Sequence, residues 1–181
     1  MVSIRNKLIL WVGEKHSGKT TSAANLARAA RDEGFNVAGL LAPSLHCNGR
    51  LIGFDALDLR NGKHAPLARR QTNPGESGRF ALATDGLKFG NAALSAEATK
   101  SADLIIVDEF GPLELNGHGW RKNVDSLLAS SDAVILLVVR RELADEVRRL
   151  YAHTPCRKLA ANDPNSIDDG LTMLKDRRRL C

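Results

Sequence analysis

Gly13-Glu14-Lys15-His16-Ser17-Gly18-Lys19-Thr20 is the stretch that decides the fold of this chain. It matches the pattern G-x-x-x-x-G-K-[ST] at each fixed position, and an apolar run over residues 8–12 precedes it. Such a loop joins a buried strand to a helix, and its glycines let the backbone wrap closely around an anion. The N–H groups of the loop and of the helix start then point at phosphates. The sequence therefore predicts a loop that binds a nucleoside triphosphate.

Each fixed side chain of this loop has a predicted task. Lys19 is expected between the β- and γ-phosphates, where it also serves catalysis, and the Thr20 hydroxyl is expected to ligate Mg²⁺. His16 occupies a variable position, where the backbone usually makes the contact. The predicted nucleotide-binding residues are Gly13, Glu14, Lys15, His16, Ser17, Gly18, Lys19, Thr20 and Thr21.

A second motif, Asp108-Glu109, follows the apolar run of residues 104–107. An acidic residue at the end of a buried strand is the usual holder of the metal beside such a loop, which assigns Asp108 to Mg²⁺. Glu109 is then placed to orient or deprotonate the attacking water, so it is predicted as a catalytic residue. A strand-terminal Asp can also merely cap the next turn, but the loop in the same chain favours the metal.

Hydrophobic periodicity predicts strands that alternate with helices along the chain. Residues 54–59 and 64–68 flank Asn61-Gly62, which is typical of an antiparallel hairpin. We therefore predict a single domain over residues 1–181, an α/β three-layer domain with a mostly parallel sheet and an added antiparallel hairpin. The other predicted elements are strands at 8–12, 35–42, 103–108 and 134–139, and helices at 21–33 (ended by Gly34), 91–101, 142–151 and 165–179 (capped by Asn165 or Ser166).

Composition narrows the class of protein. The 181 residues contain no apolar run near the ~20 needed to span a bilayer, and the start of the chain lacks the core of a signal peptide. A cytoplasmic protein without membrane contact is expected. Cys47, Cys156 and Cys181 are scattered without a C-x-x-C pair, so neither disulfides nor a zinc site are indicated.

The formal charge of +5 comes from clusters of basic residues. A basic balance suits a triphosphate or a nucleic acid, but aromatic residues are only 4%, so nucleic-acid binding has weak support. An arginine at the ligand edge could stabilise charge on the γ-phosphate. The candidates are Arg69, Arg70, Arg140 and Arg141.

The stretch Val107-Asp108-Glu109-Phe110-Gly111-Pro112-Leu113-Glu114-Leu115 resembles the "DEiGpmEL" signature of the cancer-related nucleoside-triphosphatase family. Residues 35–43, and 52–55 with 66–69, are similar to that family's second strand and hairpin. The resemblance covers roughly residues 7–150. It implies the P-loop NTPase fold, with an added strand between the loop strand and the acidic strand, and slow Mg²⁺-dependent hydrolysis of ATP, GTP and other triphosphates. Carried over, Lys19, Thr20 and Asp108 are its phosphate and metal residues, and Glu109 is catalytic.

The chain departs from that family at two places. His16 stands where the family often has Gly, and Asn162-Asp163 lacks the Arg that the family tends to place between these two residues. No Asn-Lys-x-Asp segment is present, so no strict GTP preference is expected.

Two other functions fit the same motifs. The first is a small-molecule or nucleotide kinase, with an acceptor site under the hairpin of residues 51–70. The second is a nucleotide-gated accessory protein with little turnover, whose basic surface docks a partner. The sequence leaves the oligomeric state open.

Overall fold

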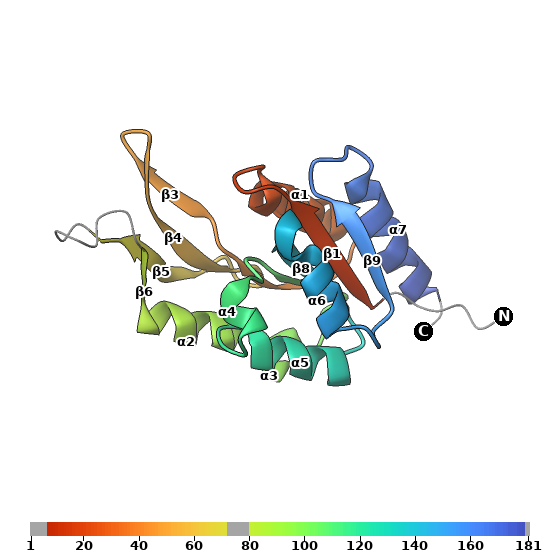
Figure 1. Cartoon of the computed structure of the whole chain (residues 1–181). Helices are drawn as coiled ribbons and strands as arrows, with labels where there is room; N and C mark the ends of the chain where they lie inside the picture. The colour runs from red at the N-terminus through yellow and green to blue at the C-terminus, as the bar shows by residue number, and fades with distance from the viewer. Residues whose placement is uncertain (1–6, 72–79, 180–181) are drawn as a thin grey trace.

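A mixed sheet of nine strands runs through residues 7–71 and 80–179, the part of the chain that the computed structural model describes (Figure 1). The strand order is β6-β5-β4-β2-β7-β8-β1-β9, and β3 pairs with β4 outside this path. The strands are β1 (Leu8–Gly13), β2 (Val37–Leu41), β3 (Ser44–Cys47), β4 (Arg50–Asp58), β5 (His64–Arg70), β6 (Phe80–Leu82), β7 (Leu104–Val107), β8 (Val134–Arg140) and β9 (Cys156–Ala160).

The five strands β2, β7, β8, β1 and β9 pair in parallel and form the centre of the sheet. Strands β1, β7 and β8 read as continuous apolar runs because both of their faces are covered. Strand β8 lies between the loop strand β1 and the acidic strand β7, which is the inserted strand that the family resemblance implies.

Helices cover both faces of the sheet and make three layers (Figure 1). On one face, α1 and α7 pack with Trp11 and Leu136 in one core cluster; on the other, α2, α5 and α6 pack with Leu10 and Leu137 in a second. The predicted α/β fold with a mostly parallel sheet is confirmed. The helices are α1 (Lys19–Asp32), α2 (Thr84–Ala93), α3 (Ala96–Thr99), α4 (Pro112–Leu115), α5 (Arg121–Ser130), the 3₁₀ turn η1 (Arg141–Leu143), α6 (Ala144–Leu150) and α7 (Ser166–Arg178).

The antiparallel strands β3 to β6, here called the arm, extend from β2 away from α1 and α7 (Figure 1). The predicted hairpin is present as β4 and β5. Asp58 holds its turn, because its carboxylate accepts hydrogen bonds from the Arg60 N–H and the Asn61 amide. Strands β3 and β6 were not predicted from the sequence, although Asn48-Gly49 between β3 and β4 is a strong turn signal.

Several predicted boundaries are wrong. The helix expected at 91–101 is two helices, because Ser95 interrupts it and accepts the Ala98 N–H as the cap of α3. The helix expected at 142–151 begins as η1 before α6. Asn165 precedes α7 but makes no side-chain cap, and Ser166 Oγ donates to the Ala160 carbonyl instead. Strand β9 and helices α4 and α5 were not predicted.

Among the residues that the structure describes, no helix is long and apolar enough to cross a membrane. Cys47 and Cys156 are free thiols. Cys181 and the N-terminal residues 1–6 lie outside the described residues.

Candidate active site

The phosphate-binding loop lies between β1 and α1, at the carboxyl edge of the sheet. Gly18 directly precedes α1 with φ 79°, a left-handed conformation that suits glycine. A Cβ on Gly13 would come within 2.6 Å of Ser17 Oγ and 2.9 Å of Lys19 Cγ. The two glycines therefore permit the tight turn, and the strand–loop–helix context predicted from the sequence is present.

The Lys19 side chain folds back against the backbone of the loop. Its side chain is only slightly exposed, and Nζ donates a hydrogen bond of 2.7 Å to the Glu14 carbonyl oxygen. The Glu14 carboxylate forms an ion pair of 2.5 Å with Arg141 on the outer side. The loop is thus closed on itself by contacts that leave the Lys19 ammonium beside the anion-binding backbone.

Asp108 follows β7 and is completely buried. Oδ2 accepts the Ala42 N–H at 3.0 Å, Oδ1 accepts the Glu109 N–H at 2.9 Å, and the Thr20 hydroxyl is a third donor. Burial raises the pKa of Asp108 to about 6, although the hydrogen bonds from Ala42, Thr20 and Glu109 oppose this shift. Within residues 7–71 and 80–179 the Asp108 carboxylate has no oppositely charged partner, and it accepts a hydrogen bond from Thr20, so it fits a divalent cation that prefers oxygen ligands.

A cation at this point would take only part of its coordination from the protein. No group of three or more His, Cys, Asp or Glu side chains suited to a metal occurs among residues 7–71 and 80–179. Mg²⁺ typically binds through one or two protein oxygens, with substrate phosphates and waters completing its shell. Thr20 and Asp108 are a sufficient protein contribution of that kind.

Glu109 adopts an unusual backbone conformation. Its φ is 62°, which costs of order 1–3 kcal/mol for a residue with a Cβ and is typical of functional sites. Its carboxylate is partly exposed, and Oε2 lies 3.8 Å from Nη2 of Arg140. The conformation directs the Glu109 side chain into the crevice while its N–H remains bonded to Asp108.

The loop and the acidic motif share one cavity of about 280 Å³, as expected for two motifs at the carboxyl edge of parallel strands. Glu109 lines the cavity together with five predicted residues of the loop and Thr21, whereas Gly13, Glu14 and Lys15 do not line it. The arm residues Ser44, His46 and Phe54, which line this cavity, were not predicted from the sequence. The Asn48-Gly49 turn was the signal that could have indicated them. The lining residues are His16, Ser17, Gly18, Lys19, Thr20, Thr21, Ala42, Ser44, His46, Phe54 and Glu109.

The four candidate arginines occupy different surroundings. Arg140 ends β8 directly beside Gly13 in the sheet and approaches Glu109. Arg141 is paired with Glu14. Arg69 is bound to Asp55 at 2.6 Å, and the Arg70 guanidinium lies over the Phe80 ring. Of the four, Arg140 is the one that the structure brings next to the acidic motif.

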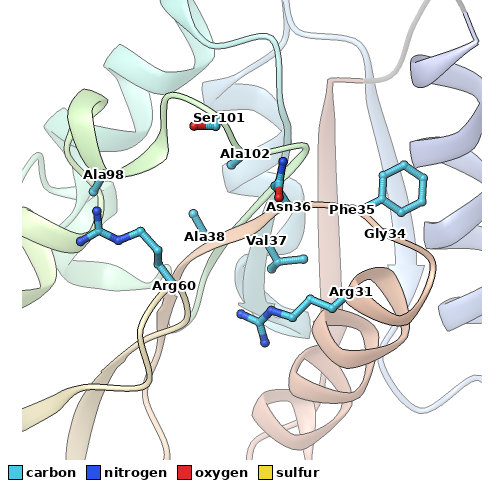
Figure 2. A pocket seen from close by; sticks show the side chains of 10 residues that line it. All are labelled: Arg31, Gly34, Phe35, Asn36, Val37, Ala38, Arg60, Ala98, Ser101 and Ala102. Carbon is cyan, nitrogen blue, oxygen red and sulfur yellow. The ribbon is translucent and has the colours of Figure 1, made fainter.

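A larger cavity of about 430 Å³ lies at the opposite edge of the sheet, around the start of β2 (Figure 2). Its two arginines are engaged: Arg31 donates to the Leu59 carbonyl, and Arg60 lies 3.6 Å from Asp58 and extends toward Ala98. The lining contains no carboxylate and no residue of the loop. This cavity therefore lacks the groups needed for phosphate chemistry.

The basic cluster at the end of α7 is largely neutralised by acidic neighbours. Lys175 is paired with Glu33 at 2.8 Å, and Arg178 lies 3.3 Å from Asp103. These ion pairs weaken the attraction of this surface for a polyanion. Nucleic-acid binding stays a prediction with weak support.

A model of the NTPase family matches residues 8–165 of the chain. The chain belongs to the NTPase family. Membership confirms the family resemblance and the predicted enzyme class, a nucleoside-triphosphatase.

Relatives and solved structures agree with this family. The Nucleoside-triphosphatase THEP1 of Methanothermobacter thermautotrophicus is 30% identical over 78% of this chain and 80% of its own length. The THEP1 of Methanopyrus kandleri is 35% identical over 69% and 67%. The crystal structure of THEP1 from Aquifex aeolicus shares the fold with a TM-score of 0.68 at 20% identity, covering 93% of this chain and 99% of that one. The solution structure of a human cancer-related nucleoside triphosphatase gives 0.66 at 20%, over 97% and 96%.

Burial of Asp108 predicts a pH dependence of stability for the metal-free protein. Because the pKa is raised from 3.8 to about 6, the folded state binds this proton more tightly than the unfolded state, so stability is lost as pH rises through 6. The unfolding free energy of wild type minus that of Asp108→Asn should fall by about 1 kcal/mol between pH 5 and 7. Urea denaturation in EDTA measures it, and a difference that rises with pH contradicts the assignment.

His16 predicts a second effect on stability, because its φ of 61° disfavours any residue with a Cβ. His16→Gly should be more stable than His16→Ala by about 1 kcal/mol, since both lose the imidazole and only glycine relieves the strain. Thermal unfolding of the two variants makes the comparison. Equal stabilities would show that the loop relaxes at this position.

Proposed function

We propose that this NTPase hydrolyses nucleoside triphosphates with Mg²⁺ in the cavity between the loop and Asp108-Glu109, with little discrimination between bases. The observation that carries the proposal is the pair of carboxylates at the end of β7. One is buried against Thr20, and the other belongs to a residue that lines the same cavity as the loop. A loop alone binds phosphate, whereas this pair supplies a metal ligand and a base for water.

Thr20 and Asp108 would hold the Mg²⁺, which when bound neutralises charge on the phosphate oxygens. The loop N–H groups and Lys19 bind the β- and γ-phosphates, for which Lys19 exchanges the Glu14 carbonyl for a phosphate oxygen. The Lys19 ammonium then stabilises the negative charge that develops on the phosphate oxygens as the terminal phosphoryl group is transferred.

Glu109 acts on the nucleophile. Its carboxylate accepts a proton from a water whose oxygen bonds to the γ-phosphorus, while the bond from that phosphorus to the β–γ bridging oxygen breaks. The products are the nucleoside diphosphate and inorganic phosphate. Arg140, 3.8 Å from Glu109, orients this carboxylate and adds positive charge at the γ-phosphate end.

Broad base preference rests on the segment after β9, which passes beside the loop helix. Ser22 Oγ donates to the Ala161 carbonyl at 2.7 Å, which brings residues 161–165 next to α1. The Asp163 carboxylate already accepts from the backbone N–H and the side-chain amide of Asn165. Both bonds fall on Oδ1, so a guanine edge that used both carboxylate oxygens would compete with Asn165 for this one. The expected cytoplasmic location is retained as part of this proposal.

Glu109→Gln should abolish most turnover while triphosphate binding persists, because the amide keeps the shape and cannot accept the proton. We expect kcat to fall at least ~100-fold, the usual contribution of a general base, with Kd for a non-hydrolysable ATP analogue changed less than about threefold. Phosphate release and calorimetry measure the two quantities.

The matched control is Glu146→Gln, an exposed carboxylate on α6 away from the cavity, which should behave as wild type. Wild-type phosphate release in the Glu109 variant would refute the assigned base. Binding without any phosphate release by the wild-type protein would refute hydrolysis itself and favour the accessory-protein alternative.

A further inference from the structure

A second cavity, here called the arm cavity, adjoins the triphosphate cavity and has a volume of about 270 Å³. The two cavities share Ala42, Phe54 and Glu109, so Glu109 borders both. The arm cavity lies beneath the hairpin, between the arm, α2 and α4. Its lining is Ala42, Phe54, Leu67, Ala68, Phe80, Leu82, Leu87, Glu109, Leu113, Glu114, Trp120 and Arg140.

The walls of the arm cavity are mainly apolar. Phe54 and Phe80 form an edge-to-face pair with ring centroids 5.3 Å apart, and Leu67, Leu87 and Trp120 complete the surround. Charged lining is limited to Glu114 and to the pair Glu109 and Arg140, which marks the border with the triphosphate cavity. A ligand of this cavity thus has an apolar body and presents one polar group toward Glu109.

The wall of the arm cavity formed by Glu114 and Trp120 is held in place by contacts within the protein. Glu114 is almost fully buried and uses both oxygens on backbone donors, the Gly111 N–H at 2.9 Å and the Trp120 N–H at 3.3 Å. The Trp120 ring packs so closely on α2 that a Cβ at Gly90 would come within 2.4 Å of it. Glu114 is therefore a positioning residue, and Glu109 remains the carboxylate available for proton transfer.

The mouth of the arm cavity exposes apolar surface. Leu82 is 50% exposed and Leu113 is 38% exposed; with Ile52 they are the exposed large hydrophobic residues of the described chain. Hydrolysis does not require an apolar cavity of this size, because a water molecule occupies only about 30 Å³ in the liquid. The cavity is several times too large and too apolar to serve as a water site.

We propose that the arm cavity is an acceptor site, which binds an uncharged small molecule with a ring-sized apolar body and a hydroxyl directed at Glu109. The hydroxyl oxygen bonds to the γ-phosphorus, its proton passes to Glu109, and the bond to the β–γ bridging oxygen breaks. The products are a phosphate monoester and the nucleoside diphosphate. This activity rests on the proposed triphosphate site, and water replaces the hydroxyl when the arm cavity holds no acceptor.

The test uses benzyl alcohol, 2-phenylethanol and cyclohexylmethanol as acceptors, each incubated with the full chain, ATP and Mg²⁺, and glycerol as the polar control. Phosphorus NMR separates phosphate monoester, inorganic phosphate and ADP in one spectrum. We expect a monoester from the apolar alcohols and none above background from glycerol. Leu82→Glu, at the exposed mouth, should lower the ratio of monoester to inorganic phosphate at least tenfold.

The matched control is Ile52→Glu, which places the same charge at an exposed apolar position of the arm outside the cavity lining and should keep the wild-type ratio. If inorganic phosphate is released but none of the three alcohols gives a monoester, the acceptor site is refuted. The proposed hydrolysis is not affected by that result. An unchanged ratio in Leu82→Glu overturns its location. Failure to form ADP under every condition overturns the proposed function instead.

Discussion

The burial of one carboxylate, Asp108, is the constraint on which the site depends. Its oxygens collect hydrogen bonds from the end of β2 through Ala42, from its own strand end through Glu109, and from the start of α1 through Thr20. Three segments far apart in the sequence are thereby fixed at one point of the sheet edge. The interaction is costly without a cation, since burial raises the pKa of the group to about 6. The proposed Mg²⁺ would offset this cost by placing a positive charge beside Asp108.

The geometry of Glu109 follows from this arrangement. Its N–H is bonded to Asp108, its backbone lies in the left-handed region at φ 62°, and the residue lines two cavities at once. One cavity is polar and is lined by the loop, and the other is apolar and is lined by the arm. Because Glu109 lies between the phosphate site and the apolar cavity, it can accept a proton from either nucleophile, a water molecule or an alcohol bound in the arm cavity. Hydrolysis and transfer to an alcohol would then differ only in the occupant of the arm cavity.

The sequence was most informative where chemistry and local pattern coincide. The loop from Gly13 to Thr20, the strand before Asp108, the placement of both motifs at one crevice and the Asn61-Gly62 hairpin all depend on short-range signals, and the structure contains each of them. What could not be predicted depends on contacts distant in sequence. Glu114 and Trp120 line the arm cavity, and the Trp120 ring packs on Gly90 of α2, a contact between distant parts of the chain that only folding creates. The choice of Arg140 among four arginines likewise required the register that sets it beside Gly13.

The thermodynamic coupling between Mg²⁺ and the triphosphate tests most directly the proposal that Asp108 holds the metal. Calorimetry would measure Kd of a non-hydrolysable ATP analogue with and without Mg²⁺ for wild type and for Asp108→Ala. We predict that Mg²⁺ tightens binding by wild type at least about fivefold, a coupling of about 1 kcal/mol, and that the variant loses this effect. An equal Mg²⁺ effect in both proteins would contradict the account, because the metal would then be held without Asp108.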